Sequence, residues 1–192
     1  IVVPPGLSSN ILAQDDPLTL KSITDGTFGA HGIYGVNPLD DGESYSQLVD
    51  GKRIVVSSFK TGEQTGVLFD VDDTKGKIKL SRIDGYTMSP NQKNILIRTK
   101  TQSIYRHSTT AVYYIYNVQN RTLAPLSDGG PQECPLWSPD GNMVGFVREG
   151  NLFLVKLLFD NAEVQVTKDG KFNSIINGKA DWVYEEEFVT NR

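Results

Sequence analysis

A turn that leads into a strand recurs three times along the chain, and this repeat constrains the fold more than any other feature of the sequence. The copies begin at Asp50, Asn91 and Asp140, so they lie 41 and 49 residues apart. Ser89-Pro90 and Ser138-Pro139 precede the second and third copies, where proline sets a turn and cannot donate a ladder hydrogen bond. A period of about 40 to 50 residues predicts a repeat architecture.

Short segments rich in β-branched and aromatic residues follow each turn, and this composition favours strands. The paired segments are 53–59 with 65–71, 94–100 with 111–118, and 143–148 with 151–159. A further segment that closes on a turn follows each pair, at 77–85, 121–130 and 163–170, and a similar one occurs early, at 18–26. The sequence therefore predicts four strands in each repeat.

The predicted fold is all-β, because no stretch shows convincing apolar spacing over three helical turns. Repeated groups of four strands further predict a β-propeller of four-stranded antiparallel blades. Residues 18–192 are expected to form a partial β-propeller domain of about three blades plus the leading strand of a neighbour. This is an incomplete ring, since closed propellers have about four to eight blades. An open ring leaves unpaired sheet edges, so we expect the intact protein to continue past Arg192. Residues 1–17 are expected to be an N-terminal tail or the remnant of a signal peptide.

The composition narrows the classes of partner. The chain has 192 residues, of which 38% are hydrophobic and 22% charged, as in an ordinary globular protein, and its net charge is -4. The acidic balance and the lack of a Lys/Arg cluster argue against nucleic acid or an anionic membrane surface as the partner. The longest apolar runs are far shorter than the roughly eighteen residues of a membrane span, so none is expected.

Neither a metal site nor a disulfide is expected from the acidic and sulfur-containing residues. Asp70, Asp72 and Asp73 form a short cluster, but it lacks the glycine and the distal glutamate of a calcium loop. Cys134 is the only cysteine, so no internal disulfide can form, and a lone cysteine among apolar neighbours is more often a core residue than a nucleophile. We therefore expect no metal and no cofactor.

Three consecutive glutamates, Glu185 to Glu187, follow Trp182 and Tyr184 in the stretch DWVYEEEF. Carboxylates held together in a partly dry setting repel one another, and a nearby cation is needed to offset this cost. The alternative is a solvated acidic turn. The rest of the chain must therefore supply a cation if this run is a site.

The connections of a propeller blade place a cation near this run. In an up-and-down blade, the connection between strands two and three emerges on the same face as the connection that leaves strand four. Segments 99–110 and 168–189 are these two connections in the second and third predicted blades. Arg106 is therefore expected to share a face with the glutamates, about one blade away, where its guanidinium can hold a carboxylate and still donate elsewhere. His107 is a weaker candidate for this site than Arg106. His31 is interpreted as a structural or loop histidine.

Two motifs in these connections, Arg106-His107-Ser108 and DWVYEEE at 181–187, resemble signatures of the dipeptidyl peptidase IV family, in the prolyl oligopeptidase class of serine peptidases. YTMSPN at 86–91 and LWSPDG at 136–141 are similar to the blade starts of that family. The resemblance begins at about Leu18, concerns the N-terminal propeller portion, and looks closest to bacterial members.

The resemblance implies roles for individual residues. Glu186 and Glu187 would bind the free ammonium group of a peptide substrate. Arg106 would order this pair and donate to the carbonyl oxygen of the second substrate residue from the scissile bond. The same motifs imply supporting roles for Glu185, His107, Tyr184 and Trp182. Tyr105 stands where mammalian relatives have tryptophan, so the packing behind Arg106 is expected to differ.

The function that the resemblance implies is substrate gating in a serine dipeptidyl peptidase that releases X-Pro or X-Ala dipeptides from peptide N-termini. The partner would be a peptide with a free N-terminus, whose ammonium group, with a pKa of about 8, suits two carboxylates. Anchoring this group fixes which peptide bond reaches a nucleophile, so the enzyme would cleave after the second residue of the peptide. The apolar first residues, which end near Ala13, weakly resemble a signal-peptide cleavage region and favour a periplasmic or otherwise exported enzyme. The resemblance to the family is compatible with a homodimer of the intact enzyme.

The catalytic half of such an enzyme is expected outside this chain. Peptide hydrolysis by this route needs a histidine, an acid and a serine, usually in a G-x-S-x-G turn. No such pentapeptide occurs, and the nearest, 42–46, lacks the second glycine. The family carries its triad and S1 pocket in a C-terminal α/β-hydrolase domain, beyond Arg192, so no catalytic residue is assigned and the chain alone should be inactive. Blade patterns alone fit equally well an alternative, a non-catalytic propeller module that binds a protein or a sugar.

Overall fold

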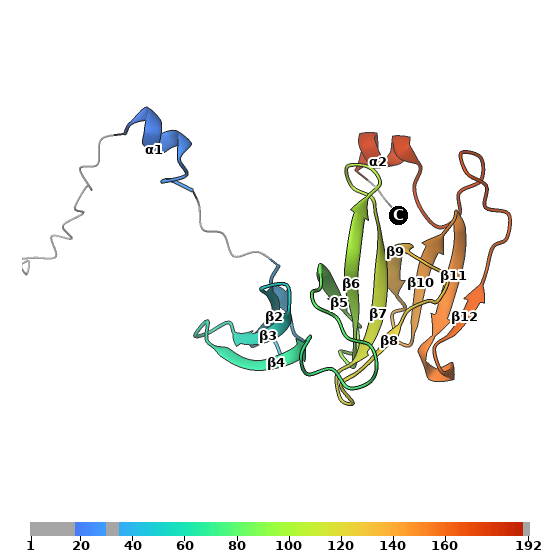
Figure 1. The fold of residues 1–192 in the computed structure, drawn as a ribbon, viewed down its shortest axis with the longest axis horizontal. Helices are drawn as coiled ribbons and strands as arrows, with labels where there is room; N and C mark the ends of the chain where they lie inside the picture. The colour runs from blue at the N-terminus through green and yellow to red at the C-terminus, as the bar shows by residue number, and fades with distance from the viewer. Residues whose placement is uncertain (1–17, 30–34, 190–192) are drawn as a thin grey trace, which may run out of the picture. The chain divides into compact units, whose positions relative to one another are not determined.

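The computed structural model describes residues 18–29 and 35–189, which belong to two compact units, Ile1–Tyr34 and Gly35–Arg192 (Figure 1). The predicted tail at 1–17 and His31 lie outside the described residues. Among the described residues, no helix is long and apolar enough to cross a membrane.

A short helix, α1 (Leu20–Thr24), forms in the first unit. The sequence predicts a strand at 18–26, and that prediction is wrong. Thr19 Oγ1 accepts the Ser22 backbone N–H at 3.0 Å, and Ser22 Oγ accepts the Thr19 N–H at 3.0 Å. This capping box satisfies donors that a strand would have to pair with a neighbouring strand. All five residues of α1 are described and none is buried, so local capping rather than packing determines this conformation.

The second unit begins with four antiparallel strands, here called the first meander. They are β1 (Asn37–Pro38), β2 (Ser44–Val49), β3 (Arg53–Ser58) and β4 (Gln64–Asp70), in the order β1-β2-β3-β4. β3 and β4 confirm the first predicted pair. The predicted closing strand at 77–85 is wrong, because residues 77–84 form no strand. Ile83 is instead buried in the core, and Ile78 and Leu80 pack against it partly buried, so these apolar side chains are covered without a ladder of backbone hydrogen bonds.

Two further meanders follow and share one sheet. The second meander contains β5 (Gly85–Met88), β6 (Asn94–Ser103), β7 (Thr109–Asn117) and β8 (Thr122–Pro125). The third contains β9 (Gln132–Trp137), β10 (Met143–Arg148), β11 (Asn151–Lys156) and β12 (Ala162–Gln165), with a short 3-10 helix, η1 (Leu157–Phe159), before β12. β9 pairs with β7 at two positions, which makes an eight-stranded sheet. These strands confirm the predicted pairs and closing segments of both repeats.

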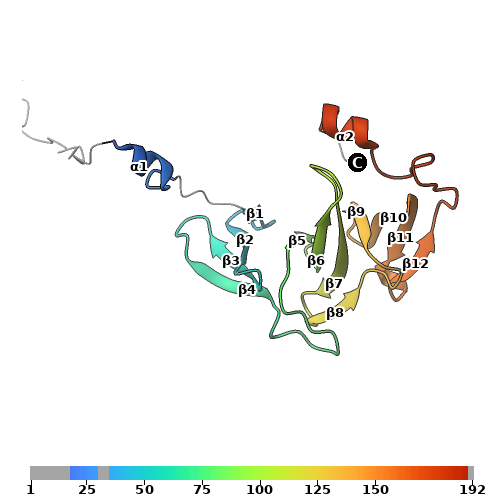
Figure 2. The ribbon, with the colours of Figure 1, turned by 45° about the horizontal axis from the view of Figure 1, so that its top comes forward.

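The predicted antiparallel β-structure is confirmed, whereas no closed ring forms within residues 35–189 (Figure 2). The described strands make two sheets, and β4 and β12 lie at sheet ends without pairing with each other. A short helix, α2 (Trp182–Phe188), follows the last strand. The three meanders are therefore consecutive copies of one strand pattern in an open series.

The two Ser-Pro turns have the same hydrogen bonds. Ser89 Oγ accepts the N–H of the residue five positions further on at 3.0 Å, and Ser138 Oγ does the same at 2.9 Å. The turns also touch, because Asn91 Nδ2 donates to the Asp140 carbonyl oxygen at 2.9 Å. Residues at equivalent positions of neighbouring repeats are thus in contact, as expected when each repeat packs on the next.

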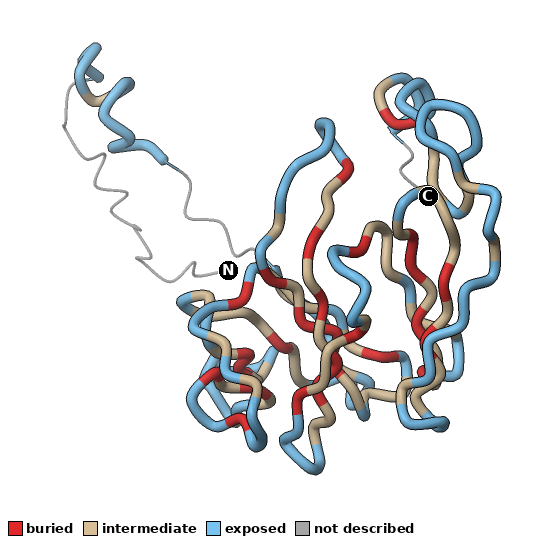
Figure 3. Tube along the Cα trace, turned by 45° about the vertical axis from the view of Figure 1, so that its right-hand side comes forward, coloured by how far each residue is buried: buried red, intermediate tan, exposed pale blue. Residues whose placement is uncertain are grey.

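Buried residues in the second unit gather along the strands, whereas most connecting loops are exposed (Figure 3). One apolar cluster contains Ile54 and Phe69 of the first meander together with Ile97 of the second. Another contains Tyr113 of the second meander and Val144 of the third. Burial of apolar surface between neighbouring meanders therefore supplies the framework that holds the loops.

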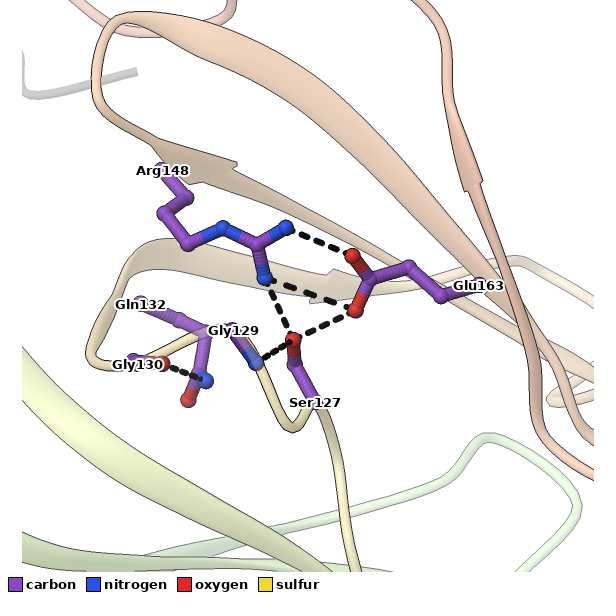
Figure 4. A network of polar contacts seen from close by, with 6 residues as sticks. All are labelled: Ser127, Gly129, Gly130, Gln132, Arg148 and Glu163. Carbon is purple, nitrogen blue, oxygen red and sulfur yellow. Dashed lines mark hydrogen bonds and ion pairs between the residues drawn. The ribbon is translucent and has the colours of Figure 1, made fainter.

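Arg148, at the end of β10, connects the second meander to the third (Figure 4). Its guanidinium forms an ion pair with Glu163 of β12 at 2.6 Å and donates to Ser127 Oγ, which follows β8. The guanidinium carbon also lies 4.0 Å from the centroid of the Phe153 ring. Although burial opposes ionisation of Glu163, the hydrogen bonds from Arg148 and Ser127 lower its pKa. The ion pair thus lies within the third meander, and charge-assisted hydrogen bonds of Arg148 and Glu163 to Ser127 join it to the end of the second meander.

Candidate functional site

The acidic run forms helix α2, which no periodicity in the sequence predicted. Asp181 caps the helix, because its Oδ1 accepts the Tyr184 backbone N–H at 3.0 Å. All seven residues of α2 are described, and Glu185 alone among them is buried. The aromatic side chains of the helix are exposed, namely Trp182, Tyr184 and Phe188. The helix therefore docks through a carboxylate rather than through an apolar face.

The loop from β12 to α2 is fastened to the third meander. The Asn177 N–H donates to the Gly150 carbonyl oxygen at 3.0 Å, in the turn between β10 and β11. Gly178 has a φ of +76°, and a Cβ there would lie 3.0 Å from a side-chain atom of β10, so glycine fits best. Next to the helix, Lys179 Nζ pairs with a Glu133 carboxylate oxygen of β9 at 2.5 Å. These contacts fix where α2 begins.

Glu185 connects α2 to the loop between β6 and β7, and the views in Figures 1 and 2 show the helix beside that loop. Its Oε1 accepts the His107 backbone N–H at 2.9 Å and the Ser108 backbone N–H at 2.8 Å. Glu185 is only 3% exposed. The expectation that these two connections share a face is therefore confirmed, and the contact runs through Glu185.

Arg106 Nη2 lies 3.3 Å from Glu186 Oε2, so the structure brings together the cation and one carboxylate of the predicted site. The Arg106 side chain is 71% exposed, whereas the Glu186 side chain is 14% exposed. Glu187 is exposed at the next position of the helix. Two carboxylates and one guanidinium give this part of the chain a net negative charge, and the carboxylate oxygens can accept charge-assisted hydrogen bonds from a cationic group.

Burial and hydrogen bonding act in opposite directions on Glu185. Burial opposes ionisation, but the Ser108 hydroxyl and the two backbone N–H groups outweigh it, so the pKa of Glu185 is lowered from its ordinary value of 4.5. Ser108 Oγ contributes to this effect although it forms no hydrogen bond of standard geometry. Glu185 is therefore ionised at neutral pH while buried, and the donors that stabilise its charge belong to the neighbouring loop.

A cavity of about 590 Å³ adjoins the same loop, and the sequence did not reveal it. His107 lines this cavity together with Arg98 of β6, Tyr113 of β7 and Cys134 of β9. Arg98 lies across Gly85 of β5, where a Cβ would be 2.8 Å from Nη2. The lining residues come from strands far apart in the sequence and carry no local pattern. His107 thus belongs both to the cavity wall and to the loop that holds Glu185.

Other residues considered from the sequence lie apart from this site. Asp73, in the short acidic cluster, forms an ion pair with Arg121. Among the described residues, no group of three or more His, Cys, Asp or Glu side chains is arranged to hold a metal ion. Ser44, in the nearest match to the nucleophile motif, is the first residue of β2.

The ion pair of Glu133 with Lys179, next to α2, is not predicted from the sequence, because two residues 46 positions apart form no motif.

A family model and a solved structure both relate this chain to dipeptidyl peptidases of type IV. Residues 89–192 match the family described as "Dipeptidyl peptidase IV (DPP IV) N-terminal region". The crystal structure of Porphyromonas gingivalis dipeptidyl peptidase 4 is similar to this chain with a TM-score of 0.81 and 41% sequence identity, over 92% of this chain and 26% of that one.

Two curated proteins show similar relationships. The probable dipeptidyl-aminopeptidase B of Talaromyces stipitatus is 34% identical over 187 residues, which cover 89% of this chain and 20% of that protein. Human prolyl endopeptidase FAP is 30% identical over 176 residues, which cover 91% of this chain and 22% of that protein. The chain therefore spans about a fifth to a quarter of the length of these three relatives.

Proposed function

Because this chain belongs to the dipeptidyl peptidase IV family, as part of the N-terminal region, we propose that it recognises the free N-terminus of a peptide substrate in a serine dipeptidyl peptidase. The intact enzyme would release X-Pro or X-Ala dipeptides. The observation that carries the proposal is the contact of Arg106 with Glu186 at 3.3 Å, with Glu187 next to it on α2.

The charges of this cluster suit a peptide ammonium group. Glu186 and Glu187 supply two carboxylates, and Arg106 offsets only one of their charges. An α-ammonium group is mostly charged near neutral pH and offers several N–H donors, so it complements the remaining charge. The Arg106 guanidinium has five N–H donors, and among the described residues it pairs with one carboxylate, so it keeps further donors for a substrate carbonyl oxygen.

Anchoring the ammonium group explains why such an enzyme would remove dipeptides. The distance from a fixed N-terminus to the scissile bond is set by the number of residues between them. A substrate held at Glu186 and Glu187 therefore presents one particular peptide bond to a nucleophile, and binding energy is used for orientation. The S1 pocket that would read proline or alanine is proposed to lie outside this chain.

The three meanders are proposed to be consecutive blades of a β-propeller that other parts of the intact enzyme complete. Their open series and their sheet-end strands β4 and β12 support this proposal. The serine, histidine and acid of the catalytic triad would come from an α/β-hydrolase domain, so residues 1–192 alone should not hydrolyse peptides. Export, for example to the periplasm, and dimerisation of the intact enzyme stay predictions from the sequence.

Variants of the intact enzyme test the proposal. Glu186→Ala and Glu187→Ala are each expected to lower kcat/KM about 30-fold or more for a peptide with a free amine, because removing one carboxylate leaves the bound ammonium group without one of its partners, which costs about 2 to 5 kcal/mol. Acetylating the substrate amine should have a similar effect on the unmodified enzyme and little further effect on either variant. Glu63→Ala, which removes an exposed carboxylate of the first meander, is the control.

The opposite result would be unchanged turnover of the free-amine peptide by both glutamate variants. That result would mean that Glu186 and Glu187 do not bind the substrate ammonium group. If the intact protein also hydrolysed no peptide, a non-catalytic propeller module that binds a protein or a sugar would be the better account.

A further inference from the structure

Helix α2 has little stability of its own. It has seven residues, which is shorter than the roughly 12 to 15 residues that isolated helices need to be even marginally stable in water. Trp182 and Phe188 are 54% and 66% exposed, so burial of aromatic surface contributes little to its position. The loop before α2 fixes where the helix begins, and the tertiary contacts of its one buried residue, Glu185, hold the helix itself against the neighbouring loop.

The ion pair between Arg106 and Glu186 is too exposed to set the geometry of the site. The Arg106 side chain is largely in solvent, and exposed ion pairs typically contribute about 0 to 1 kcal/mol because water and salt screen them. A long arginine side chain also loses rotamer freedom when it is held in one position. Something other than this ion pair must keep the two groups close.

Glu185 meets that requirement. Its buried Oε1 accepts two consecutive backbone N–H groups, at 2.9 and 2.8 Å, and hydrogen bonds to a charged acceptor are about twice as strong as neutral ones. The donors belong to His107 and Ser108, so the first of them is the residue after Arg106. Glu185 itself immediately precedes Glu186. One carboxylate thus ties the backbone next to the arginine to the backbone next to the glutamate.

We propose that Glu185 is a positioning residue, which fixes Arg106 relative to Glu186 and thereby sets the preference of the intact enzyme for peptides with a free N-terminus. This inference rests on the proposed function. It assigns to Glu185 no contact with substrate. Its effect is transmitted through the 104–108 loop, because both of its donors are backbone groups of that loop.

The test measures a ratio in the intact enzyme, namely kcat/KM for a free-amine dipeptide substrate divided by kcat/KM for the same substrate with an acetylated amine. Glu185→Gln keeps the size and an acceptor oxygen but removes the charge that strengthens both hydrogen bonds. It is expected to lower this ratio about tenfold. A loss of folded enzyme lowers both rates equally and leaves the ratio unchanged.

A matched control separates positioning from general destabilisation. Glu163→Gln also removes a partly buried carboxylate with a lowered pKa, but at the junction of the second and third meanders, where Arg148 and Ser127 contact it. It is expected to lower stability without changing the ratio. Hydrogen exchange of the His107 and Ser108 amides in the intact enzyme should become faster in Glu185→Gln and stay unchanged in Glu163→Gln.

A double-mutant cycle completes the test. If Glu185 acts by placing Arg106, Glu185→Gln should change the ratio less than about twofold when Arg106 is already alanine. Multiplicative effects in the double variant, or an unchanged ratio in Glu185→Gln, would overturn the inference. These results differ from failure of the proposed function, in which Glu186→Ala and Glu187→Ala would also leave the ratio unchanged.

Discussion

Glu185 and Ser108 are 77 residues apart in the sequence, yet Glu185 Oε1 accepts the Ser108 backbone N–H at 2.8 Å. This hydrogen bond joins the segment that leaves the third meander to the loop between the two central strands of the second. Ser108 is itself buried, so the contact lies at the inner end of that loop. The exposed part of the loop, with Arg106, is thereby held against α2.

The docking of α2 should be sensitive to acid. The pKa of Glu185 is lowered in the folded protein, from an ordinary value of 4.5, so its ionised form contributes stability that is fully present above pH 4.5. That contribution is lost as the pH falls below 4.5 and through the lowered pKa. Intrinsic amide exchange slows in acid, so the quantity to compare is the protection factor, and the protection factors of the His107 and Ser108 amides should fall as the pH drops below 4.5.

The Glu185→Gln variant provides the comparison for this acid effect. A glutamine does not titrate, so the protection of the two amides should already be weaker at neutral pH and should show no further loss below pH 4.5. An equal pH dependence in the variant and the unmodified protein would mean that another group controls the docking of α2.

Arg148 should be one of the more costly residues to replace in the second unit. Its side chain is 15% exposed and contacts Glu163, Ser127 and the Phe153 ring together. Arg148→Met keeps much of the apolar volume but leaves Glu163 without its cation, which should lower the free energy of unfolding by about 2 kcal/mol. Arg53→Met, which removes the exposed pair with Asp50, should cost less than about 1 kcal/mol in the same denaturant titration.

Gly178→Ala should displace the start of α2. Its Cβ would approach a Val147 methyl group to 3.0 Å and a Leu152 methyl group to 3.2 Å, at a φ of +76° that disfavours alanine. We expect a loss of about 2 kcal/mol in unfolding free energy, together with weaker binding of free-amine peptides. Gly62→Ala has nearly the same φ, +73°, but no atom within 4 Å of the added Cβ, so it isolates the backbone effect.

The repeat made most of the fold predictable, because turns at Ser89 and Ser138 and the β-branched segments after them are local signals. The connections expected in a propeller blade also predict Arg106 on the same face as the glutamates, and Arg106 contacts one of them, Glu186. Segments 18–26 and 77–85 were misread for one reason. Their composition favours strands, but a strand also needs a neighbouring strand to pair with. In segment 18–26 a capping box satisfies the backbone donors of a helix, and in segment 77–85 the apolar side chains pack against the core.

The part of the site that the sequence did not reveal depends on long-range contacts. Nothing in three consecutive glutamates distinguishes the one that is buried, because burial depends on two backbone donors at positions 107 and 108. Helix α2, which carries the three glutamates, is too short for a recognisable apolar period. The anchoring pair of Lys179 with Glu133 likewise joins residues with no shared motif.

Val189 ends helix α2 in a left-handed conformation, with a φ of 54°, which is costly for a β-branched residue and is the position where glycine is common. Val189→Gly should remove about 1 to 2 kcal/mol of strain but increase the entropy of the unfolded chain, so a net gain of up to about 1 kcal/mol is expected. Slower hydrogen exchange of the α2 amides would report this gain. The same substitution inside the helix, Val183→Gly, should act in the opposite direction, by about 1 kcal/mol, because glycine is a poor helix former. Faster exchange in both variants would show that Val189 stabilises the helix end through contacts rather than straining it.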